Sequence, residues 1–187
     1  MFMVSSTVTL FICYWSAMGH IVSAFTGTGR TDDPDPVTGL TSRDRYYVTS
    51  SWARLMKNPT DSGVALLTLF FKKYPEYIEL FPFKDLDPSE FPTNARFRAH
   101  CNSVVYALSA VVDSLDTSDV LVELLTKTGS SHSRRKVTRE GFLHLKETAL
   151  ELFSTLFKPE ELDAWKKTFD VAFSVIIKGL EAATASE

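Results

Sequence analysis

The chain has 187 residues, which is room for one ordinary domain with at most a short appendage. Its 44% hydrophobic and 23% charged residues are typical of a globular protein, and a net charge of −3 argues against nucleic acid as the main partner. The 2 cysteines are too few for a disulfide scaffold or for a zinc or iron–sulfur site built from cysteine. The unusual number is the 14 Phe, which indicates a large apolar interior.

Residues 1–24 have the character of a leader, because they contain no Asp, Glu, Lys or Arg. The apolar centre, about residues 8–18, matches a secretory signal and is short for a membrane span, although no positive side chain precedes it. Val22-Ser23-Ala24 supplies the small residues of a cleavage site. We therefore expect cleavage and secretion, with an uncleaved membrane anchor or an unprocessed tail as alternatives. The Pro-rich residues 25–39 are expected to be a linker.

From residue 40 onward the apolar residues recur at helical spacing, and no segment shows the period of two that indicates a strand. A first helix opens at the imperfect capping box Thr41-Ser42-Arg43-Asp44 and ends at Asn58-Pro59. A second helix is expected over 61–74, and Pro75 after it begins a short turn. The sequence therefore predicts an all-α protein.

A long amphipathic helix follows Asn94, which is a suitable N-cap residue. Its predicted apolar stripe consists of Phe97, Val104, Leu108, Val111 and Leu115. A shorter helix has its own apolar face, made of Leu121, Leu124, Leu125 and Thr128. A third has Phe142, Leu145, Ala149, Leu152 and Leu156. The last helix begins with Pro159 in its first turn, and residues 182–187 are expected to be a C-terminal tail.

Two histidines lie on the apolar faces of separate predicted helices. His100 stands four residues before Val104, and His132 stands four residues beyond Thr128. One such histidine is by default a core residue with its hydrogen bonds satisfied, but two that face a Phe-rich interior indicate metal ligands. No Asp, Glu, Cys or further His accompanies them, so a three-ligand zinc site is not assembled. A planar macrocycle supplies four nitrogen ligands itself and needs only one or two axial groups and a large apolar slot.

In their order and intervals, these residues resemble a globin, specifically an arthropod-type single-domain globin. The ordered residues are Trp52 in the first helix, Pro75 and Phe81 after the second, then His100, His132 and Trp165. The resemblance implies a globin fold of about seven or eight helices around a pocket for haem b. It covers nearly all of the chain after the linker, and we expect the globin domain over residues 40–181.

The resemblance assigns the proximal side of the haem to His132. Its Nε2 would bind the iron, and its Nδ1–H would donate to a nearby backbone carbonyl or hydroxyl. Thr128 stands where the family usually has Leu, and we favour packing over acceptance of that bond because Thr in helices often bonds its own preceding turn. Phe81 corresponds to the corner Phe that packs on the porphyrin, and Val137 and Phe142 are expected at the opposite haem edge.

On the distal side the resemblance places His100, Val104 and Leu67. His100 would donate a hydrogen bond to bound dioxygen, or would itself be the sixth ligand of the iron. Val104 and Leu67 would keep water out of the gas site.

Weaker expectations concern four further residues. Arg135 or Lys136 is a candidate partner of the haem propionates, although this basic run equally suits a solvated loop. His144 falls outside the apolar stripe of its helix and is expected at the surface. Cys101 is expected to be a buried thiol without a role, with a disulfide between two chains of a homodimer as the alternative.

The favoured function is reversible binding of dioxygen or another diatomic gas, in transport or storage, rather than enzymatic catalysis. One alternative is a six-coordinate redox or gas sensor in which His100 also binds the iron. Nitric-oxide dioxygenase or peroxidase chemistry is another, but no Arg accompanies His100 on the distal apolar face. No nucleic acid partner is expected, and a membrane only if the leader remains.

Overall fold

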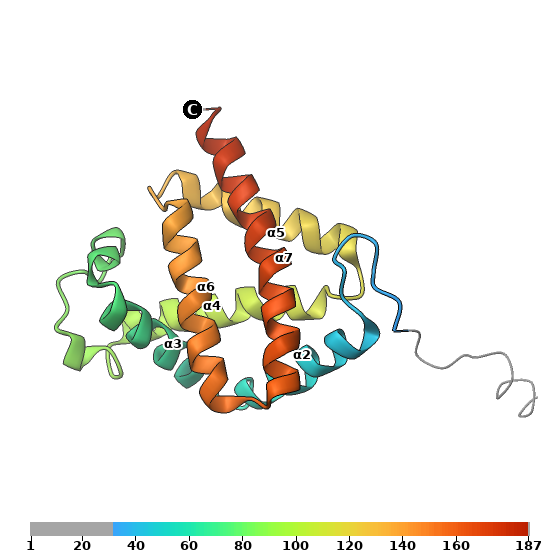
Figure 1. Cartoon of the computed structure of the whole chain (residues 1–187). Helices are drawn as coiled ribbons and strands as arrows, with labels where there is room; N and C mark the ends of the chain where they lie inside the picture. The colour runs from blue at the N-terminus through green and yellow to red at the C-terminus, as the bar shows by residue number, and fades with distance from the viewer. Residues whose placement is uncertain (1–31, 187) are drawn as a thin grey trace, which may run out of the picture. The chain divides into compact units, whose positions relative to one another are not determined.

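The computed structural model describes residues 32–186, and residues 34–186 form one compact unit. Within the described residues the chain forms six α-helices, two short 3₁₀ helices and no strand, which confirms the all-α prediction (Figure 1). The elements are α2 (Ser42–Leu55), α3 (Pro59–Lys73), η1 (Pro75–Leu80), η2 (Pro88–Glu90), α4 (Ala95–Asp113), α5 (Ser118–Ser133), α6 (Arg139–Leu156) and α7 (Pro159–Thr184). The predicted leader and its cleavage site lie outside the described residues. In the part that is described, none of the helices combines the length and the apolar character that a membrane crossing requires.

Two helices begin at the polar caps that the sequence predicts. Thr41 Oγ1 accepts from the backbone N–H of Asp44 at 3.1 Å, and the Asp44 carboxylate accepts from the backbone N–H of Thr41 at 3.0 Å. The side-chain oxygen of Asn94 accepts from the backbone N–H groups of Arg96 and Phe97 at 2.9 and 3.1 Å. These bonds satisfy amide groups that the first turn of a helix leaves unpaired, so α2 and α4 start where expected.

Four boundaries differ from the predicted ones. Helix α2 ends at Leu55 rather than at Asn58-Pro59. Helix α3 begins at Pro59 rather than at residue 61, because proline lacks the N–H that a first helical position leaves unpaired. Helix α7 runs to Thr184, so the first three residues of the expected tail are helical. The last residues of the expected linker are folded, since Thr38 is buried and its backbone N–H donates to the Asp35 carboxylate at 2.7 Å.

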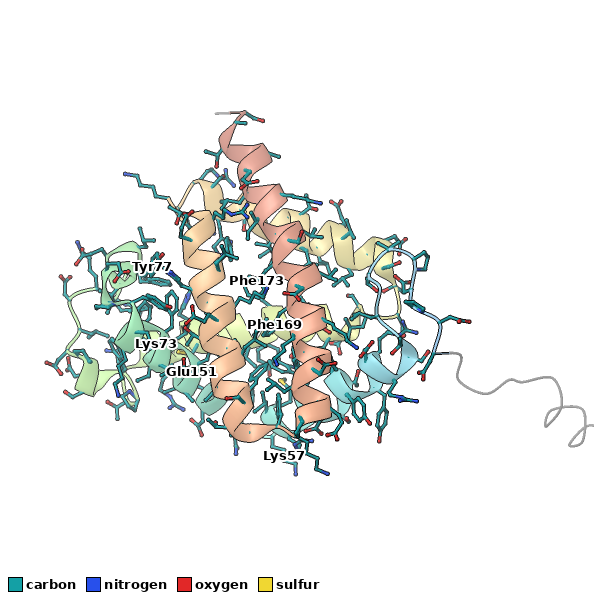
Figure 2. All side chains as sticks on the ribbon, viewed as in Figure 1. Lys57, Lys73, Tyr77, Glu151, Phe169 and Phe173 are labelled. Carbon is teal, nitrogen blue, oxygen red and sulfur yellow. The ribbon has the colours of Figure 1, made fainter. Side chains whose placement is uncertain are left out.

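The larger of two apolar clusters joins α2, α4, α5, α6 and α7. Trp165 is fully buried in it and donates from Nε1 to Ser51 Oγ at 2.8 Å. Trp52 packs on Trp165 with ring centroids 5.5 Å apart. Phe169 and Phe173 extend from α7 toward α6 (Figure 2), where their rings pack against Phe153 and Phe142. This cluster fixes α6 beside α7 in Figure 1.

The smaller cluster joins α3, the segment after it and the first half of α4, and it contains five phenylalanines. Its buried members are Leu67, Phe70, Phe71, Phe83, Phe91, Phe97 and Cys101. Phe91 and Phe97 stack with ring centroids 4.4 Å apart. The two clusters meet along α4, whose residue Val104 packs against both.

Candidate functional site

His132 lies in the last turn of α5 and is held by its own helix. Its Nδ1 is 2.8 Å from the backbone oxygen of Thr128, one turn earlier. Because a carbonyl only accepts, Nδ1 must carry the proton and Nε2 keeps its lone pair. The ring packs edge-on against Phe142 of α6, with centroids 5.2 Å apart. His132 therefore presents a free ligating nitrogen from a fixed ring, with the backbone partner that the sequence predicts.

The hydroxyl of Thr128 takes no part in this bond. It donates to the backbone oxygen of Leu124 at 2.8 Å, in the preceding turn of α5. This confirms the expectation that the Thr128 side chain packs and bonds its own helix rather than accepting from His132.

His100 is half-buried on α4 and is held by aromatic rings. Phe81 meets it edge-on with centroids 5.0 Å apart, and Phe83 lies at 5.7 Å. Burial lowers the pKa of His100 below its usual 6.5, and electrostatic interactions with His132 and Arg135 lower it further. His100 is therefore a neutral imidazole near neutral pH.

The expected apolar lining residues lie in one of the two clusters or where the clusters meet. Val104 and Leu145 are half-buried and pack against both, so they lie where the clusters meet. Leu67 is buried in the smaller cluster, and Val137 packs against the larger one. Leu145 is a lining residue that the sequence analysis missed, although its place three residues after Phe142 on one helical face could have indicated it.

The basic loop after α5 leaves Arg135 close to the site. Arg135 Nη1 donates to the backbone oxygen of Ser131 at 2.9 Å, and its charge acts on the pKa of His100. The next residue, Lys136, has a positive φ of 59°, which turns the chain toward α6. Arg135 thus remains a predicted partner for an anionic group at the edge of the site.

The surface location predicted for His144 is wrong. The ring is half-buried and stacks on Tyr74 with centroids 4.0 Å apart, and its Nδ1 is 3.0 Å from the hydroxyl of Tyr77. Beside them Lys73 pairs with Glu151, so this polar group joins α3 to α6 (Figure 2). The stripe of a single helix does not reveal it, because the partner side chains come from α3 and η1.

Cys101 is fully buried where α4 crosses α3, and burial raises the pKa of its thiol to about 12. A disulfide between two chains through Cys101 is therefore incompatible with this fold. A pocket of about 330 Å³ lies elsewhere, between α2, α3, α4 and α6, and neither His100 nor His132 lines it.

The donor set suits a planar metal macrocycle. His132 offers one strong imidazole ligand from a ring that its own backbone orients, and His100 can offer a second or a hydrogen bond. Val104 and Leu145 are half-buried and apolar where the two clusters meet, and a flat apolar group would cover them. The residues present thus fit haem, which His132 and His100 would hold.

Comparison with known proteins agrees with this geometry. A family model described as Globin matches residues 64–176. Cytoglobin-1 of Oryzias latipes is 31% identical over 144 residues, which cover 73% of this chain and 81% of that protein. A globin of Nerita albicilla is 28% identical, with 77% and 95% covered. The structure of a hexa-coordinate haemoglobin from Drosophila melanogaster has a TM-score of 0.71 at 30% identity and covers 74% of this chain and 94% of its own.

Proposed function

Because this chain belongs to the globin family, with haem as its cofactor, we propose that it binds dioxygen reversibly and serves in oxygen transport or storage. The iron of bound haem supplies the position at which the gas is taken up. The observation that carries the proposal is the bond between His132 Nδ1 and the Thr128 carbonyl, because it leaves Nε2 of His132 free as the axial ligand.

The proximal face is made by α5 and α6. His132 would bind the iron through Nε2. Phe142, whose ring centroid lies 5.2 Å from that of His132, restrains rotation of the imidazole ring. Val137, which packs against the larger cluster, would cover the haem edge on this side. Arg135, which is exposed and donates to the backbone oxygen of Ser131, would pair with a propionate.

The distal face is made by α3 and α4. Neutral His100 carries one N–H, which would donate to a gas ligand held by the haem. Leu67 and Val104 would exclude water from the same space, and Phe81, which orients His100 through its ring contact, would pack on the porphyrin. Water exclusion disfavours oxidation of the bound haem, which reversible gas uptake requires.

A second candidate is a six-coordinate resting state in which His100 also binds the iron. The support within this chain is that His132 and Arg135 both act electrostatically on the half-buried His100, which places α4 and the end of α5 near each other. The Drosophila melanogaster structure at 30% identity is of a hexa-coordinate haemoglobin, which adds to this support. In that state an arriving gas would have to displace His100. Sensing or redox chemistry would then be a better-supported function than transport.

The proximal assignment is tested by replacing His132 with glycine and adding free imidazole. We expect His132→Gly to lose the visible spectrum of the ferrous wild type, and added imidazole to restore it by occupying the vacated space. His144→Gly is the matched control, because it removes another half-buried imidazole, on α6, and should keep the wild-type spectrum. A His132→Gly protein with an unchanged spectrum contradicts the proposal.

A further inference from the structure

Helices α5 and α7 cross one another (Figure 1). Their backbones are in contact at the crossing, where each helix has a glycine. A Cβ atom on Gly129 would overlap the backbone oxygen of Ile176 and would lie 2.7 Å from the backbone nitrogen of Leu180. A Cβ atom on Gly179 would overlap the backbone oxygen of Thr126. No larger residue fits at either position unless the helices move apart.

A side-chain hydrogen bond reinforces the crossing. Ser130 Oγ lies 3.2 Å from the backbone oxygen of Gly179 on α7 and 3.1 Å from that of Thr126 on its own helix. Helix α5 is therefore both in close contact with α7 and hydrogen-bonded to it over the same turn.

His132 follows this crossing directly. It stands three residues after Gly129 and two after Ser130, and α5 ends at Ser133. On the other side, α7 is the longest described helix, with 26 residues, and Ile176, Ile177 and Leu180 are buried in the larger cluster. The turn of α5 before His132 is thus fixed to α7, whose own position is fixed by its buried side chains in the larger cluster.

We propose that the crossing of Gly129 and Gly179 is a positioning contact that sets how closely His132 Nε2 approaches the haem iron. A contact between two backbones contains no side chain that can change rotamer, so it resists sliding more than ordinary side-chain packing. The hydrogen bond from Nδ1 to Thr128 passes this constraint to the imidazole, because Thr128 directly precedes Gly129. The inference rests on the proposed function, which makes His132 the axial ligand.

The test is the iron–histidine stretching band in the resonance Raman spectrum of the reduced, gas-free holoprotein. All proteins carry His100→Leu, so that His132 is the one axial ligand whichever resting state the wild type has. We expect Gly179→Ala to shift the band, because the new methyl group separates α5 from α7. We expect Ser130→Ala to shift it less, because this change removes a hydrogen bond without adding volume.

Gly63→Ala is the matched control. Its Cβ would lie 2.5 Å from the backbone oxygen of Cys101, at the crossing of α3 with α4 rather than of α5 with α7. The control should lose stability like Gly179→Ala and keep the band in place.

The outcomes separate the two claims. An unshifted band in folded Gly179→Ala overturns the inference, and if that variant does not fold, an unshifted band in Ser130→Ala overturns it instead. Absence of any iron–histidine band in the His100→Leu parent means that His132 is not the ligand, which overturns the proposed function rather than the positioning role.

Discussion

His132 and His100 are restrained in different ways, and this difference assigns them different roles. The ring of His132 is tied to the backbone of α5 by a hydrogen bond of 2.8 Å. His100 is held by contacts with Phe81 and Phe83, at 5.0 and 5.7 Å between centroids. A hydrogen bond is directional and determines which nitrogen carries the proton, whereas ring contacts do neither. We therefore expect His132 to be the constant ligand and His100 to be the group that approaches or leaves a bound gas.

His100→Leu should accelerate dioxygen release. A hydrogen bond to a partly charged ligand is worth about 1.5–3 kcal/mol, so its loss should raise the dissociation rate roughly 10- to 100-fold. The rate is measured by mixing the oxygenated protein with a dioxygen scavenger in a stopped-flow instrument. His144→Leu is the control, because this ring contacts Tyr74 and Tyr77 instead. Equal rates in wild type and His100→Leu would show that His100 does not donate to the gas.

At the scale of secondary-structure elements, Glu161 joins the start of α7 to the end of α2. Its carboxylate accepts from the backbone N–H of Lys158 at 3.0 Å and from both terminal nitrogens of Arg54 at 2.9 and 2.7 Å. The bonds from Arg54 lower the pKa of Glu161 below its usual 4.5, although burial opposes them. One side chain thus caps α7 and fixes its direction relative to α2.

Glu161→Gln should destabilise the fold by about 1–2 kcal/mol at pH 7, a modest value because Arg54 is nearly half exposed and solvent screens the pair. The pKa of Glu161 is lower in the folded than in the unfolded chain, so its contribution is complete above about pH 4.5 and is lost as the pH falls through the folded value. Urea unfolding from pH 7 to pH 3 should show the gap between wild type and variant closing in acid. Exposed Glu160→Gln is the control, and a gap that does not depend on pH would contradict this account.

The starts of α2, α4 and α7 were predictable because their causes are local. Asn94 caps α4, and Pro159 opens α7, through groups that lie within one turn of the chain. The crossing at Gly129 and Gly179 was not predictable, because each glycine is explained only by the backbone of a helix distant in sequence. The contacts of His144 with Tyr74 and Tyr77 were not predictable for the same reason, because these residues are distant from it in sequence.

At the scale of the whole molecule, the site lies where two apolar clusters meet. The larger cluster is built on α7 and the smaller one on the phenylalanines around α3 and the start of α4, and Val104 and Leu145 belong to both. The order of His100 and His132 along the chain indicated this site, because the family resemblance depends on that order. The place of Leu145 at this site was recognised only from the structure, in which Leu145 of α6 packs against both clusters.

We propose that the protein is secreted after removal of residues 1–24, which rests on the sequence of the leader alone. Expression of the full chain in a secreting eukaryotic cell should give a protein in the medium that begins at Phe25. Mass spectrometry of the intact protein checks this by the mass of the missing 24 residues. A full-length chain retained in the membrane fraction would favour the uncleaved anchor.

The central claim is that His132 holds a haem whose opposite face takes up gas reversibly, and the visible absorption spectrum of the reduced holoprotein tests it most directly. The spectrum is recorded without oxygen, after oxygenation and again after deoxygenation. We predict one broad visible band in the gas-free protein, which splits on oxygenation and returns when oxygen is removed. A protein that shows no Soret band after reconstitution with haem, or none that responds reversibly to dioxygen, would contradict the account.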